Sequence, residues 1–77
     1  MDNKVYVDIY AKFMKDGRLI PFTVIWENGT VYAIDYVKEI KRFAKNGKTR
    51  FVYTCVVEGK ECHLHYEGDK WYMERKR

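Results

Sequence analysis

The sequence is poor in the residues that interrupt or cross-link a chain. Its 77 residues include one proline, five glycines and two cysteines. No apolar run reaches the roughly 18 residues that a membrane-spanning helix needs. So little proline and glycine argues against a disordered or collagen-like chain. The first ten residues lack the charged, apolar and small-residue order of a signal peptide. We therefore expect a cytoplasmic protein without a membrane segment, in which Cys55 and Cys62 are reduced thiols.

Aromatic residues are abundant by contrast. The chain has seven tyrosines, four phenylalanines and two tryptophans. Large rings bury much area per residue, so a short chain rich in them can build a core without disulfides or metals. We expect one domain that spans residues 1–77.

Four glycine-containing segments predict tight turns between strands: KDGR (15–18), ENGT (27–30), EGK (58–60) and EGDK (67–70). Asp-Gly and Asn-Gly suit hairpin turns, which need positive φ values. The runs between them alternate or are apolar on both faces, as strands do. Pro21 cannot donate to a ladder, so the start of its strand should be an edge or a bulge.

Residues 36–46 break the strand period. Val37, Ile40 and Ala44 follow helical spacing, and Asn46-Gly47 would end a helix well. The pattern predicts a mainly β protein: an antiparallel meander of five or six strands, closed into a small SH3-like barrel or bent roll, with one short helix near residues 36–46. A flat sheet with the helix on one face is the alternative.

Positive charge is concentrated in residues 37–50. This segment holds six of the fifteen basic residues and one of the eleven acidic residues. On a helix, four of its cations would form one stripe that the next loop and strand extend. The full set is Lys38, Lys41, Arg42, Lys45, Lys48 and Arg50.

Two interpretations of this stripe are possible, one functional and one purely structural. Contact with several phosphates would give weak, sequence-tolerant nucleic-acid binding that salt suppresses. The other interpretation is the solvated polar face of an amphipathic helix, because Lys and Arg favour helices. We take nucleic-acid binding as the first functional hypothesis.

Protein contact is the alternative function. Tyr6, Tyr10 and Tyr72 are expected to point outward, and tyrosine offers large rigid contact area. An uncovered sheet edge could also pair two copies of the chain into a homodimer. Salt-insensitive, concentration-dependent association would separate this hypothesis from phosphate binding.

The two cysteines fall on adjacent predicted strands. If Glu58 and Gly59 are the turn residues, Cys55 lies directly opposite Cys62. A shift of the turn by one residue would change this opposition. We favour two buried thiols over a disulfide, because the intervening loop is short and the expected compartment is reducing.

Neither a metal site nor an active site is predicted. His63 and His65 share one side of a strand with Glu61 and Glu67, but their spacing matches no metal signature. We favour a solvated polar face there. The sequence has no arrangement typical of a nucleophile with its base. We expect a protein without catalytic activity, cofactor or small-molecule substrate.

The succession DGRLIPFTVIWENGTVYAID, followed by YTC and WYMER, resembles short uncharacterised bacterial all-β proteins. These share a glycine turn, a proline within a strand, a Trp-acidic-Gly hairpin and a late tryptophan. The resemblance implies a common fold, and it brings no activity or site residues.

Overall fold

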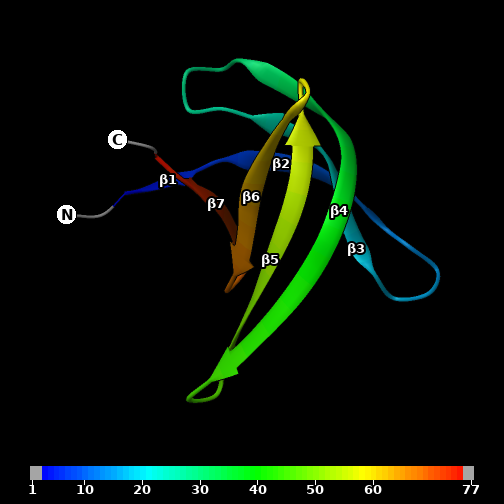
Figure 1. Cartoon of the computed structure of the whole chain (residues 1–77). Helices are drawn as coiled ribbons and strands as arrows, with labels where there is room; N and C mark the ends of the chain where they lie inside the picture. The colour runs from blue at the N-terminus through cyan, green and yellow to red at the C-terminus, as the bar shows by residue number, and fades with distance from the viewer. Residues whose placement is uncertain (1–2, 76–77) are drawn as a thin grey trace.

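The computed structural model describes residues 3–75, which form seven β-strands (Figure 1). In chain order they are β1 (Lys4–Tyr6), β2 (Asp8–Phe13), β3 (Leu19–Ile25), β4 (Val31–Lys45), β5 (Lys48–Val57), β6 (Lys60–Glu67) and β7 (Lys70–Glu74). All belong to one antiparallel sheet in the order β1-β7-β6-β5-β4-β3-β2, which curls into a half-barrel. Residues 3–75 contain no helix, and hence none that could cross a membrane.

The first predicted strand is divided in two, which accounts for seven strands where five or six were expected. β1 and β2 stand at opposite ends of the strand order, although only Val7 separates them in the chain. The Val7 amide donates to the Trp71 carbonyl at 3.1 Å. One continuous segment thus pairs first with β7 and then with β3, and it joins the two ends of the curled sheet.

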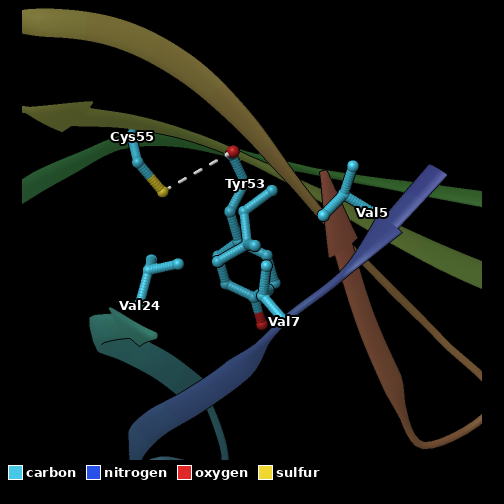
Figure 2. Close-up of a cluster of buried hydrophobic side chains, with 6 residues drawn as sticks. Val5, Val7, Val24, Tyr53 and Cys55 are labelled. Carbon is cyan, nitrogen blue, oxygen red and sulfur yellow. Dashed lines mark hydrogen bonds between the residues drawn. The ribbon is translucent and has the colours of Figure 1, made fainter. Parts of the chain in front are cut away.

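The core lies on one face of the sheet, which we call the inner face. Figure 2 shows the Tyr53 ring beside Val7, with Val24 and Cys55 directed into the same interior. The buried cluster consists of Val5, Val7, Val24, Tyr53, Cys55 and Leu64. Apolar burial of this kind contributes about 25 cal/mol per Å². The opposite side of the sheet is called the outer face below.

Two-residue turns set the register of the last strands. Glu58 and Gly59 both have positive φ, 51° and 77°, as a type I′ hairpin turn requires. The resulting pairs include Cys55 with Cys62 and Tyr53 with Leu64. The conditional prediction of directly opposed cysteines is therefore confirmed.

The predicted helix at residues 36–46 is wrong, because β4 continues to Lys45. Asn46 and Gly47 have φ values of 52° and 77°, so they form a hairpin turn and not a helix end. Two β-bulges produced the misleading spacing. Register shifts after Ile34 and after Val37 each insert one residue, so Ile34, Val37 and Ile40 face inward at intervals of three.

β3 and β4 separate after a short stretch of pairing. Only Thr23–Ile25 pairs with Val31–Ala33. Pro21 adjoins a bulge in β3, which is one of the two alternatives, an edge or a bulge, that the sequence predicted. Beyond that point the Tyr53 hydroxyl donates to the Leu19 carbonyl at 2.6 Å. This side chain therefore links β5 to β3 where the backbone ladder between β3 and β4 has ended.

Candidate nucleic-acid interface

The hairpin of β4 and β5 brings four of the six predicted basic residues to one face. Partners in an antiparallel ladder share a face. Lys45 pairs with Lys48, and Phe43 between the β4 lysines pairs with Arg50. All of these side chains, with Lys41, are on the outer face. We call this set the basic face: Lys41, Phe43, Lys45, Lys48 and Arg50.

The other two predicted cations lie elsewhere. Arg42 pairs with Phe51 and therefore points to the inner side of the hairpin. Lys38 lies in the second bulge of β4, and its ammonium is 3.4 Å from a Glu61 carboxylate oxygen. The predicted helical stripe does not exist, because alternation along a strand separates neighbours that a helix would align.

A hollow of about 610 Å³ marks the tip of the hairpin. Three cations and one aromatic ring of the basic face line it: Lys45, Lys48, Arg50 and Phe43. Glu67 on β6 is the acidic residue at its rim, opposite Arg50 in the ladder. Positive charge thus outnumbers negative charge around an open depression, which suits an anionic ligand.

Arg50 and Phe43 are positioned against each other. The Arg50 guanidinium carbon lies 5.2 Å from the centre of the Phe43 ring, within cation–π range. The Phe43 side chain is nevertheless 46% exposed. Arg50 Nε is buried without a hydrogen-bond partner among the described residues. The Arg50 side chain thus lies between the Phe43 ring and the hollow, with its Nε covered and its hydrogen-bonding capacity unused within the described chain.

A buried stack of two rings lies beside Arg50 on the outer face. The rings of His65 and Tyr72 are parallel within 5° at 4.7 Å, and they are only 8% and 3% exposed. Burial lowers the pKa of His65, an effect that Glu74 at 3.5 Å partly opposes. His65 is consequently neutral near pH 7. It therefore adds no positive charge beside the basic face.

This burial corrects the prediction of a solvated histidine face. His63 is exposed as expected, but His65 is covered. The three tyrosines predicted to point outward are likewise exposed only in part of the set. Tyr6 and Tyr10 are exposed by 53% and 58%, whereas Tyr72 lies beneath Tyr6 and the Lys4 ammonium.

The sequence could have indicated part of this geometry. Lys41, Phe43 and Lys45 alternate up to Asn46-Gly47, which is a strong hairpin signal when alternating residues flank it. Taken as a strand, this run places its cations and ring on one face. The contributions of Glu67 and His65 had no local signal, because they depend on how β6 pairs with β5.

Within residues 3–75, no group of three histidine, cysteine, aspartate or glutamate side chains has a metal-binding arrangement. Comparisons with family models, with curated proteins and with solved structures find no match to this chain. The resemblance to short bacterial all-β proteins therefore stays a prediction.

Proposed function

We propose that the chain binds single-stranded nucleic acid, with little sequence preference, through the basic face. The observation that supports this most directly is the direct opposition of Lys45 and Lys48, followed on β5 by Arg50. Like charges directly opposite each other destabilise an antiparallel pair. A phosphate between the two ammonium groups would replace this repulsion with attraction.

Phe43 favours a single strand over a duplex. Its exposed ring lies among the cations of the basic face and borders the hollow. An unpaired base can stack on such a ring while neighbouring phosphates contact Lys41 and Lys45, and stacking is tolerant of sequence because every base has a π-face. In a duplex the bases are already stacked on each other.

The salt dependence follows from the number of cations. If the four cations of the basic face each neutralise one phosphate of a single strand, log K falls with log salt at a slope of about −3. Raising salt from about 50 to about 200 mM then weakens binding by about 50-fold. Phosphate contacts carry little sequence information, so oligonucleotides of different sequence should differ by much less.

Fluorescence anisotropy with labelled DNA and RNA, single-stranded and duplex, tests the proposal. We expect binding to single strands with the salt slope above, and at least a tenfold loss in Lys48→Glu. The matched control is Lys60→Glu, which changes net charge equally at an exposed residue opposite Val57, at the far end of β5 from Lys48. Equal losses in both variants would point to net charge alone, and no binding at low salt would refute the proposal.

Stability provides a second readout of the same variant. Lys48→Glu turns a repulsive pair into an attractive one, so it should raise the free energy of unfolding by about 0.2–1 kcal/mol. A variant that is more stable and yet has lost binding cannot have lost it through misfolding. Reduced stability in Lys48→Glu would contradict the assumed proximity of the two ammonium groups.

A further inference from the structure

β4 has a long backbone edge that no strand of the described chain covers. Its pairing with β3 ends at Ala33, whereas the strand runs to Lys45. Every residue from Lys38 to Lys45 is exposed, including Ile40 and Phe43 at 37% and 46%. Figure 1 shows the lower half of β4 extending past β3 on this side. A long uncovered edge is a template for another strand.

Ladder geometry identifies the backbone groups on this edge. The two-residue turn makes Lys45 and Lys48 the first hydrogen-bonded pair of the hairpin, and hydrogen-bonded and non-bonded pairs then alternate. The N–H and C=O groups of Ile40, Arg42 and Ala44 therefore point away from β5. These three residues offer a regular edge, because the bulges of β4 lie before Glu39.

We propose that the β4 edges of two copies of this chain pair antiparallel about a two-fold axis at Arg42. The regular segment Glu39–Lys45 overlaps its own copy fully only when it is centred on its middle residue. In that register Ile40 and Ala44 of one copy exchange backbone hydrogen bonds with Ala44 and Ile40 of the other. Arg42 likewise exchanges backbone hydrogen bonds with Arg42 of the other copy. All three residues whose N–H and C=O groups point away from β5 are therefore hydrogen-bonded in this register.

Side chains support this register on the outer face. Glu39 of one copy lies opposite Lys45 of the other, and this favourable pair occurs twice. Lys41 lies opposite Phe43 of the second copy, where a cation–π contact is possible. A groove of about 850 Å³ lies beside the start of this edge and is lined by residues of β2, β3 and β4, among them Lys12, Phe22 and Lys38. In this register the Asn46-Gly47 turn of the second copy reaches Lys38, beside that groove.

Arg42 is the unfavourable element, because it meets its own copy. The edge segment is also net positive, so association should be weak and should strengthen as salt screens the repulsion. This is the opposite sign to nucleic-acid binding, which salt weakens. The dimer would place both basic faces on the same side of one continuous four-stranded surface. The pairing itself uses backbone groups and does not depend on the proposed nucleic-acid binding.

Disulfide trapping tests the register. In a background of Cys55→Ala and Cys62→Ser, Arg42→Cys places two cysteines directly opposite each other, at a Cα separation of about 5.5 Å that a disulfide can span. The matched control is Ala44→Cys, whose two copies are offset by four positions, or about 13 Å along the strand. In a glutathione redox buffer we expect covalent dimers of the first variant at least tenfold faster. Equal rates, or no dimer of either variant, would overturn the register.

Sedimentation equilibrium of the unmodified chain tests the association itself. We expect a weak dimer that tightens with salt, that Arg42→Ser strengthens several-fold and that Glu39→Lys weakens. The double variant Glu39→Lys, Lys45→Glu should restore it, because the pair is only reversed. A monomer at millimolar concentration in high salt would overturn the inference. Lys48 lies on β5 and not on the β4 edge, and Lys48→Glu lowers the positive charge that opposes association, so this variant should not weaken the dimer although it loses nucleic-acid binding. Loss of nucleic-acid binding and loss of pairing are therefore distinguishable.

Discussion

Removal of one hydroxyl group, in Tyr53→Phe, tests how β3 is held where it parts from β4. The Tyr53 side chain is 3% exposed, and its ring packs 5.4 Å from that of Trp71. Burial raises the pKa of Tyr53, so the phenol remains a protonated donor to the Leu19 carbonyl at 2.6 Å. Phenylalanine keeps the ring packing and removes only this bond.

The expected loss is about 1 kcal/mol for the bond, and about 2 kcal/mol if the Leu19 carbonyl is left without a water partner. For a chain of this length each kcal/mol corresponds to about 6 °C in Tm, so the shift should be about 6–12 °C. Urea and thermal unfolding monitored by circular dichroism measure both quantities. Tyr36→Phe is the control, because Tyr36 is 57% exposed and its change should stay within about 0.5 kcal/mol.

Amide exchange locates the effect. Tyr53→Phe should speed exchange in β2 and β3 more than in β5 and β6, since the lost bond joins the Leu19 end of β3 to β5. If Tyr53→Phe were no less stable than Tyr36→Phe, the Tyr53 hydroxyl would not stabilise the position of β3 against β5, and the reasoning would be refuted.

Three further predictions concern titration, reactivity and turn geometry. Because burial lowers the pKa of His65, the unfolded chain binds a proton at higher pH than the folded chain, and the free energy of unfolding should fall as pH drops below about 6.5. In denaturation series at several pH values, His65→Gln should reduce this fall, and an equal reduction in His63→Gln would contradict the assignment to His65. Burial raises the pKa of Cys55 to about 12, so in the folded protein iodoacetamide should modify Cys55 much more slowly than Cys62, and equal rates by mass spectrometry would contradict this. Glu58 has φ of 51° where asparagine is favoured, so Glu58→Asn should raise the free energy of unfolding by about 0.5–1 kcal/mol in urea, and a loss of stability would argue against a type I′ turn.

The parts of the fold that could be predicted from the sequence are those that local signals define. Glu58-Gly59 specified a two-residue turn, and the register of β5 against β6 followed from it, including Cys55 opposite Cys62. Pro21 indicated the bulge in β3 by the same kind of reasoning. In each case one residue type restricts the backbone and leaves few alternatives.

The course of β4 could not be predicted in this way. Its bulges insert residues after Ile34 and Val37, and the inward side chains then follow a spacing that helices also use. A period of three supports either structure over so short a segment. Pairing with β5 decides whether this segment is a helix or a strand. That pairing joins residues on both sides of the Asn46-Gly47 turn, so it is not visible within the segment itself. The division of the first strand at Val7 is likewise a consequence of how the sheet curls.

Four of the six cations in the predicted site lie together on the basic face, and the helical arrangement predicted for them is wrong. The cations were visible as a cluster in the sequence, because charge can be counted without a fold. Whether they share a face depends on the secondary structure. The change from helix to strand removes Lys38 and Arg42 from the set and adds Phe43, a ring that a helical stripe of cations would not have included.

The hairpin tip carries features that reduce stability and that the core does not explain. Lys45 faces Lys48, Phe43 is exposed, and the outer half of β4 lies beyond the buried cluster. A shorter hairpin that ended near Phe51 and Arg42 would keep every buried residue of the core and remove the like-charge pair. Stability alone would therefore favour the shorter hairpin or an acidic residue in place of one lysine. The proposed anionic ligand would offset the like charges of Lys45 and Lys48 and cover Phe43, and the proposed second strand would cover the part of β4 beyond the core.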